Sequence, residues 1–177
     1  MSNELRRWMR LVEERMTETR IIAYHGTDAA DLKSFDLGKT GQGATAGRWA
    51  PGFQPDASVY FATEPHHAAH YGEHIHKFLI DAPLLEKDAA QELEQWAREL
   101  HYHNAQTMID EYFDGNAYNA LDADNYFADA NREAQRAGLP GAIISFGDLT
   151  DSVGGRNRRV GNVIVLNDLS VATMVSD

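Results

Sequence analysis

The sequence predicts a single domain of the α+β class, with helices and strands kept in separate stretches of the chain. At 177 residues the chain suits one hydrophobic core, and its apolar content of 43% is ordinary for a globular protein. Short apolar runs of strand length are separated from longer stretches that have the 3.6-residue period of helices. No Gly-x-Gly-x-x-Gly motif follows a strand, so a Rossmann-type dinucleotide site is not expected.

The first half of the chain predicts an amphipathic helix followed by short strands. Apolar residues recur at helical spacing near the N-terminus, and Pro65 suits the first turn of a later helix. The glycine-rich loop between them has the length of a functional loop rather than of a plain connector. The predicted elements are a helix over 3–18, a strand over 21–25, a helical turn over 29–35, a loop over 36–57, a strand over 59–62, a helix over 64–71 and a strand over 77–81.

The second half predicts an acidic helical insertion and the last strands of the sheet. Residues 86–137 hold twelve acidic and four basic residues, so this stretch carries −8 of the net charge of −11. Such an acidic face serves either solubility or a basic partner. The predicted elements are helices over 88–113 and 122–137, a turn over 138–141, a strand over 142–146, a loop over 147–161 and strands over 163–166 and 171–175.

Composition excludes several classes of function. There is no cysteine, which rules out disulfides and thiolate chemistry and fits a reducing, cytoplasmic compartment. No apolar run approaches the roughly 18 residues that span a bilayer, and the N-terminus lacks the features of a secretory signal. The negative charge argues against a broad nucleic-acid-binding surface, although Arg156, Arg158 and Arg159 could form a local basic patch.

Three motifs carry the chemistry. Tyr24-His25-Gly26-Thr27 ends one predicted strand, Tyr60-Phe61-Ala62 forms the next, and Tyr71 follows Tyr60 by eleven residues on a helix. In this order and spacing they resemble the ADP-ribosyltransferase superfamily of the diphtheria-toxin and poly(ADP-ribose) polymerase type. The stretch from Gly138 onward resembles the compact domains of phage polyvalent proteins. The resemblance covers about residues 20–81 and 138–175 and leaves out the N-terminal helix and the acidic insertion.

The resemblance implies a split β-sheet core, NAD as co-substrate and cleavage of the bond between nicotinamide and ribose. It implies that the Gly26 backbone holds the carboxamide, that His25 bonds a ribose hydroxyl with support from Thr27, and that Tyr60 and Tyr71 sandwich the nicotinamide ring. The implied product is mono-ADP-ribose on a macromolecular acceptor, either a host protein or a nucleic acid. The phage-type relatives imply a role as an effector against a host target.

The sequence departs from the family pattern at Asn162, where the family usually has a glutamate. An amide can bond a ribose but cannot supply the negative charge that the reaction needs. Another carboxylate is therefore expected to substitute, with Asp148 as the first candidate and Asp151 as the second; both could equally be ordinary loop aspartates. Ala68 stands where many family members have a serine that contacts the carboxamide.

Four alternatives or extensions remain open. A metal-dependent hydrolase is one, because histidines cluster at helical spacing, although Gly72 is expected to end the helix before His74 and His76. A catalytically weak NAD-binding pseudoenzyme is another, and a relative of the RNA 2′-phosphotransferases is a third. We also predict that residues 86–137 choose the partner and are dispensable for NAD binding. The clustered histidines are His66, His67, His70, His74 and His76.

Overall fold

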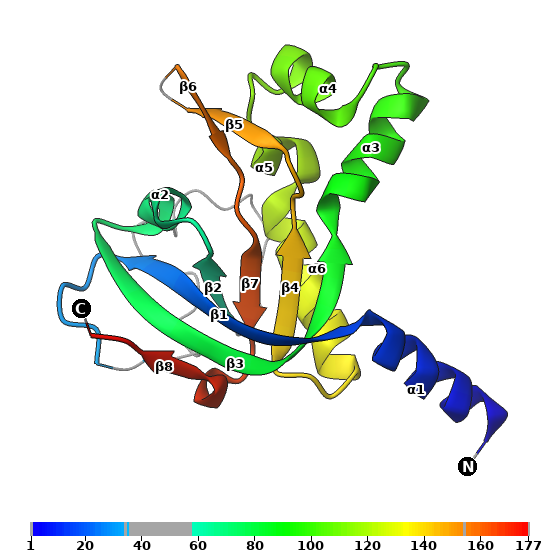
Figure 1. The fold of residues 1–177 in the computed structure, drawn as a ribbon, viewed down its shortest axis with the longest axis vertical. Helices are drawn as coiled ribbons and strands as arrows, with labels where there is room; N and C mark the ends of the chain where they lie inside the picture. Colours follow the sequence, from blue (N-terminus) through cyan, green and yellow to red (C-terminus); the bar gives the residue numbers. More distant parts are fainter. Residues whose placement is uncertain (1, 34, 36–57, 154, 177) are drawn as a thin grey trace.

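The computed structural model describes residues 2–33, 35, 58–153 and 155–176, and within them the chain is α+β, as the sequence predicts (Figure 1). The predicted loop over 36–57 lies outside the described residues. The strands are β1 (Met16–Thr27), β2 (Val59–Ala62), β3 (His74–Asp88), β4 (Gly141–Ser145), β5 (Thr150–Val153), β6 (Arg156–Arg159), β7 (Val163–Leu166) and β8 (Ala172–Met174). The helices are α1 (Asn3–Arg15), α2 (Pro65–Ala68), α3 (Ala89–Glu99), α4 (Ala105–Tyr112), α5 (Ala117–Leu121) and α6 (Ala123–Arg136), with 3-10 turns η3 (Ala69–Tyr71) and η4 (Leu169–Val171).

The main sheet is built around a long two-stranded ribbon. Among the described residues, six strands pair in the order β1-β2-β7-β4-β3-β8, and β1 also pairs with β3. The β1–β3 ribbon is antiparallel and runs from Met16 opposite Leu85 to Thr27 opposite His74. The other edge of β1 meets β2 at Tyr24, and the far end of β3 runs parallel to β4. The ribbon therefore curves around the short strands β2, β7 and β4 and pairs with both outer members of that group (Figure 1).

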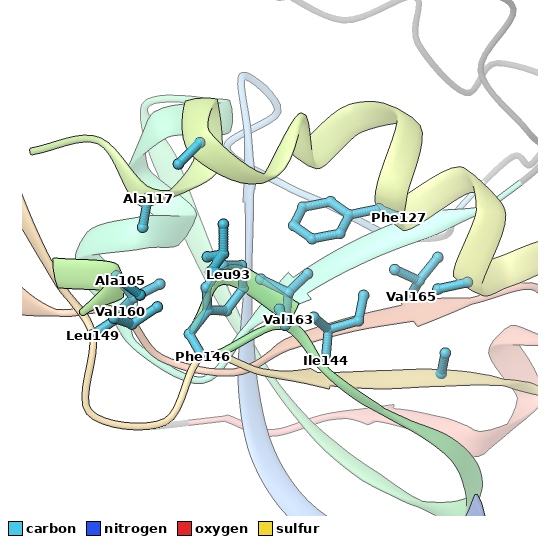
Figure 2. Packing of buried hydrophobic residues seen from close by; sticks show 14 of the residues in the cluster. Leu93, Ala105, Ala117, Phe127, Ile144, Phe146, Leu149, Val160, Val163 and Val165 are labelled. Atoms are coloured by element: carbon cyan, nitrogen blue, oxygen red, sulfur yellow. The ribbon is translucent and has the colours of Figure 1, made fainter. Parts of the chain in front are cut away.

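Hydrophobic side chains pack in two layers, one on each face of the short strands. We call them the ribbon layer, against β1 and β3, and the helical layer, under α3 to α6. Figure 2 shows part of the helical layer. Phe61 on β2 lies in the ribbon layer and its neighbour Tyr60 packs on the helical layer, because successive side chains of a strand point to opposite faces. The buried members of the ribbon layer are Ala23, Val59, Phe61, Phe78, Ile80, Ala82, Leu84, Ile164 and Leu166.

The acidic segment 86–137 is part of the core rather than an addition to it. Leu93, Met108, Ile109 and Phe127 of its helices are at most 2% exposed and belong to the same buried cluster as the β4 and β7 side chains of the helical layer. Alanines fill most of the remaining buried helix positions and allow the helices to approach the sheet closely. The prediction that this segment is dispensable conflicts with this packing, because removing it would expose one whole face of the short strands to water.

Several elements differ from the predicted ones because distant segments pair. The predicted helix over 3–18 ends at Arg15, since Met16 is already extended (φ −89°, ψ 137°) and begins β1. β1 and β3 are both longer than predicted, because each supplies the partner for the other. The predicted loop over 147–161 contains the β5–β6 hairpin. In the described part of 29–35 there is no helical turn.

Helix α1 projects from the body of the domain (Figure 1). None of its residues is buried, and Leu5, Trp8 and Met9 are 43–48% exposed on its apolar side. Within the described part of the chain, two apolar side chains from this region pack on the helical layer. They are Val12 of α1 and Met16, the residue that follows the helix.

Candidate functional site

Two glycines hold the α2–η3 segment directly against the end of β1. A Cβ atom on Gly26 would lie 1.9 Å from the carbonyl oxygen of Ala68, and one on Gly72 would lie 2.2 Å from the carbonyl carbon of Thr27. Neither separation leaves room for a side chain, so both positions require glycine for packing alone. The contact brings Tyr71, the last residue of η3, beside the Gly26–Thr27 end of the strand.

Tyr60 and Tyr71 are both half-buried and lie within electrostatic range of each other. The Tyr60 ring meets Phe127 of α6 edge-on, with centroids 5.5 Å apart. Burial raises the pKa of the Tyr71 hydroxyl above its usual range, and the charge of Asp124 and the nearby Tyr60 phenol raise it further. At physiological pH the Tyr71 hydroxyl is therefore neutral, and its aromatic ring is suited to stacking. Stacking of nicotinamide between the two rings stays a prediction.

His25 lies on the opposite face of the sheet from the Tyr60 ring. Its imidazole packs with Phe35 and Phe61 in the ribbon layer, at centroid distances of 5.0 Å and 5.5 Å. Burial lowers the pKa of His25, and nearby His76 lowers it further, against the opposing effect of a hydrogen bond to Tyr60. His25 Nδ1 lies 2.8 Å from the Tyr60 carbonyl oxygen. Because a carbonyl can only accept, Nδ1 carries the proton and Nε2 of the neutral ring is left as an acceptor.

Thr27 and Asn162 have polar contacts that belong to the fold. The Thr27 hydroxyl accepts a hydrogen bond from the Ala29 amide at 3.3 Å. The backbone N–H of Asn162 donates to the Thr63 hydroxyl at 2.8 Å, and the backbone carbonyl of Asn162 accepts from the backbone N–H of Thr63 at 2.9 Å. These bonds extend the β2–β7 ladder by one residue and hold Asn162 where β2 leaves the sheet.

Asp148, the first candidate for the missing carboxylate, is not brought together with the other predicted site residues. Its side chain is fully exposed, and its nearest cation, Arg159, is 4.0 Å away and itself exposed. The turn after β4 explains this orientation. Phe146 and Leu149 both point into the helical layer, and Gly147 between them has a positive φ of 56°, which leaves Asp148 at the outer tip of the turn.

Asp151, the second candidate, is instead a buried carboxylate within a chain of polar side chains. It is 3% exposed, and its Oδ1 accepts a hydrogen bond from the Ala117 amide at 2.7 Å. Its Oδ2 lies 3.4 Å from His67 Nε2, and His67 Nδ1 lies 3.0 Å from the Tyr118 hydroxyl. Sequence reasoning missed the roles of His67 and Tyr118, since the only local signal was two adjacent histidines on a short helix. Residues 118 and 67 meet only in the folded chain.

Burial determines the charge states in this polar chain. The pKa of His67 is lowered to about 4, first by burial and then by nearby His66, His70 and Arg158, so its ring is neutral near pH 7. Burial raises the pKa of Asp151, against the stabilising hydrogen bond from Ala117. The 3.4 Å contact between His67 and Asp151 lies off the hydrogen-bond direction. His67 Nε2 is therefore a buried atom without a hydrogen-bond partner among the described residues.

Two adjoining cavities meet at this polar chain and share Asp151 and His70 in their walls. The larger, which we call the acidic pocket, measures about 380 Å³. The smaller, the histidine pocket, measures about 160 Å³. The acidic pocket is lined by His70, Tyr71, Phe113, Asn116, Tyr118, Asn119, Asp122, Ala123, Asp124 and Asp151. The histidine pocket is lined by His66, His67, His70, Asp151 and Arg158.

The clustered histidines do not form a metal centre in the described part of the chain. Gly72 ends η3, as predicted, and the chain then enters β3 at His74. His76 belongs to that strand, with its Nε2 2.9 Å from the Ala29 carbonyl oxygen. Across the described ranges, no group of three or more histidine or carboxylate side chains is arranged to hold a metal ion. The described residues therefore give no support to the metal-dependent hydrolase alternative.

Comparisons with known proteins give one match in structure and none in sequence. No protein family model matches the chain, and no curated protein sequence matches it. One similar solved structure is a chain of the MbcT–MbcA toxin–antitoxin complex of M. tuberculosis, with 14% sequence identity and a TM-score of 0.42. The match covers 95% of this chain and 88% of that one. In the described residues, no helix is long and apolar enough to cross a membrane.

Proposed function

We propose that this chain is an NAD-dependent mono-ADP-ribosyltransferase, which cleaves the nicotinamide–ribose bond and transfers ADP-ribose to a macromolecular acceptor. The observation that carries the proposal is a meeting of separate segments. The His25–Thr27 strand end lies against η3, Tyr71 of η3 is within electrostatic range of Tyr60, and Tyr71 lines a pocket whose wall includes the buried carboxylate of Asp151. Residues far apart in the sequence thus supply flat aromatic surfaces and a carboxylate to one region.

The residues of this region suit the parts of NAD. Tyr60 and Tyr71 offer aromatic faces for the planar nicotinamide ring. The carboxamide is assigned to the Gly26 backbone, with Thr27 next to it, on the resemblance alone, because the Ala68 carbonyl fills the space where a side chain of residue 26 would lie. His25 has its Nε2 available as an acceptor for a ribose hydroxyl, because Nδ1 donates to the Tyr60 carbonyl.

Asp151 is the carboxylate that we assign to the chemical step. As the glycosidic bond breaks, its electron pair leaves with nicotinamide, and positive charge develops on the ribose. A nucleophilic atom of the acceptor then bonds to the ribose carbon, and its proton passes to the Asp151 carboxylate. Burial raises the pKa of Asp151, which makes it a stronger proton acceptor than an exposed aspartate. His67 and Tyr118 act as positioning residues behind it.

The test compares two aspartates of the same stretch with purified protein, labelled NAD and host lysate as the source of acceptor. We expect Asp151→Asn to reduce nicotinamide release and acceptor labelling by about a hundredfold or more, since it removes the charge and the proton acceptor. Asparagine keeps an oxygen for the bond from Ala117, so the fold should persist. Asp148→Asn is the matched control and should retain activity, because its side chain lies in solvent.

Three outcomes separate the alternatives. Full activity in Asp151→Asn, with a normal circular dichroism spectrum, would show that the carboxylate is elsewhere. Loss of activity in Asp148→Asn would restore Asp148 as the first candidate for the carboxylate. Wild-type protein that binds NAD and shows no turnover with lysate present would favour the NAD-binding pseudoenzyme, an alternative that Asn162 favours by lacking a charge.

A further inference from the structure

We infer that the β5–β6 hairpin holds the backbone of a single-stranded RNA, so that a ribose hydroxyl enters the histidine pocket and acts as the acceptor of ADP-ribose. The inference deepens the proposed function, on which its acceptor role rests, whereas RNA binding itself does not require NAD. Three observations carry it: the arginines of β6, the place of Asp151 in the hairpin and two unpartnered imidazole atoms in the histidine pocket.

The arginines make β6 a basic edge on an acidic protein. Arg156, Arg158 and Arg159 are all exposed, on a chain whose net charge is −11. Arg159 reaches back to the body of the domain, where it donates to the Gly147 carbonyl oxygen at 3.3 Å. In the described part of the chain, Arg156 and Arg158 form no ion pair with a carboxylate. Phosphates, which the acidic remainder of the surface repels, would therefore gather at these two side chains.

The register of the hairpin places this basic edge at the proposed catalytic carboxylate. Arg158 pairs with Asp151 across the two strands, and Arg156 pairs with Val153 nearer the turn. Because alternate residues of a strand share a face, Arg156 lies on the same face of the hairpin as Arg158 and Asp151. Arg158 and Asp151 both line the histidine pocket. A nucleic-acid strand held along β6 therefore passes the histidine pocket.

The histidine pocket lacks partners for two buried imidazole atoms. The Nε2 atoms of His66 and His67 have no hydrogen-bond partner among the described residues, and both side chains line the pocket. An Asp151 carboxylate oxygen lies 3.4 Å from His67 Nε2 and favours a proton on that nitrogen, so that Nδ1 accepts from the Tyr118 hydroxyl. His67 Nε2–H is therefore a buried donor without an acceptor, and a ligand that accepts from it would offset the cost.

The ligand of the pocket has to accept one hydrogen bond and donate another. It must accept from His67 Nε2–H and donate to the adjacent Asp151 carboxylate. Lysine and arginine side chains have no acceptor, and the carboxylate of an acidic peptide has no proton to donate and would be repelled by Asp151. A ribose hydroxyl does both, and in RNA hydroxyls alternate with the phosphates that arginines bind. At about 160 Å³ the pocket has room for the hydroxyl-bearing edge of a sugar.

A hydroxyl held there stands next to the proposed chemical step. In the proposed function nicotinamide stacks on Tyr71 of the acidic pocket, which shares Asp151 with the histidine pocket. The hydroxyl oxygen bonds to the ribose carbon of NAD, while the bond to nicotinamide breaks and its electron pair leaves with nicotinamide. The hydroxyl proton passes to the Asp151 carboxylate. His67 keeps its proton throughout and holds the oxygen in place.

The first experiment measures binding without NAD. A short fluorescein-labelled single-stranded RNA, a DNA of the same sequence and a glutamate-rich peptide are titrated by fluorescence anisotropy at low and high salt. We expect RNA to bind severalfold more tightly than DNA and at least tenfold more tightly than the peptide, with weakening at high salt. Arg156→Gln and Arg158→Gln should each weaken RNA binding severalfold. His67→Leu should remove the preference for RNA over DNA, whereas His67→Gln, which keeps an N–H donor, should retain part of it.

Arg7→Gln is the matched control, because it makes the same charge change on an exposed position of α1, which projects from the domain far from the hairpin (Figure 1). An equal loss of RNA affinity in Arg7→Gln and Arg156→Gln would overturn the inference, since the effect would then be one of general charge. Equal affinity for RNA and DNA would also overturn it, because no ribose hydroxyl would then be recognised. Tighter binding of the acidic peptide would do the same.

The second experiment offers labelled NAD with the same RNA, the same DNA and a lysate protein fraction freed of nucleic acid. Label on RNA that ribonuclease digests, reduced in Arg156→Gln, supports both proposals. RNA binding without nicotinamide release or labelling would retain the RNA site and reject the proposed function. Label on protein with none on RNA, or equal labelling of RNA and DNA, would retain the proposed function and reject the inference.

Discussion

The contact between Gly26 and α2 gives a prediction whose size follows from the structure. In Gly26→Ala, the new Cβ would lie 1.9 Å from the Ala68 carbonyl oxygen, whereas a carbon and a carbonyl oxygen normally stay about 3.3 Å apart. The obstacle is backbone, so α2 must move away by roughly 1.4 Å. Overpacking of this kind costs about 1–3 kcal/mol, which for a chain of this length lowers Tm by about 2–12 °C. Because Tyr71 follows α2, NAD affinity should fall as well.

Gly72→Ala separates packing from ligand binding. Position 72 is not a proposed NAD contact, yet its Cβ would meet Thr27 backbone at 2.2 Å, so we expect the same two losses. Gly138→Ala is the control, since it has a positive φ of 72° but open space around it and should lose stability while keeping NAD affinity. The assays are thermal unfolding and titration calorimetry. A wild-type Tm in both Gly26→Ala and Gly72→Ala would refute the close packing.

Three further predictions concern the tyrosines, the buried histidine and the acidic segment. Tyr60→Ala and Tyr71→Ala should each weaken NAD binding by about 1 kcal/mol or more, and wild-type affinity by calorimetry in both would refute the stacking. The pKa of His67 is about 4 in the folded protein, below its ordinary value of 6.5. Between pH 6.5 and pH 4, the His67 imidazole therefore takes up a proton in the unfolded chain but not in the folded protein. The free energy of unfolding should therefore fall as pH drops from 6.5 toward 4, by up to about 3 kcal/mol from this group, and His67→Gln should reduce the fall in denaturant titrations. Replacing residues 86–137 by a Gly/Ser linker should abolish cooperative unfolding, and a well-folded product would contradict the core role of that segment.

The sequence predicted best those elements whose signal is local. The strand over 59–62 and the strand over 163–166 match β2 and β7 because each is a short apolar run. Residues 16–20 gave no such signal, since Thr17, Glu18 and Arg20 read as polar. They form a strand because β3 lies opposite them. The arginine-rich β6 is likewise a strand only through its pairing with β5.

For the proposed site, the sequence shows the motifs but does not show which of the candidate carboxylates is buried. The strand end at Gly26, Tyr60 and Tyr71 stand at spacings that could be read along the chain, and the glycine contacts bring the first and last together. Choosing between Asp148 and Asp151 required the direction of two side chains that are three residues apart. A turn at Gly147 sets that direction. The positive φ of Gly147 could not be predicted from the sequence, because glycine also occurs at positions with other backbone conformations.

The pairing of β7 between β2 and β4 has a consequence for how the chain folds. β1 pairs only once β3 is present, β3 pairs with the later β4, and both β2 and β4 need β7, which follows all of these strands in the chain. Such a high contact order predicts slow folding, on a scale of milliseconds to seconds, with little of the sheet able to form early. During synthesis, a nascent chain that ends before Val163 lacks the strand that joins the two halves of the short-strand group. The NAD region that we propose would therefore be completed only after β7 has been synthesised, and a product truncated before Val163 would be inactive.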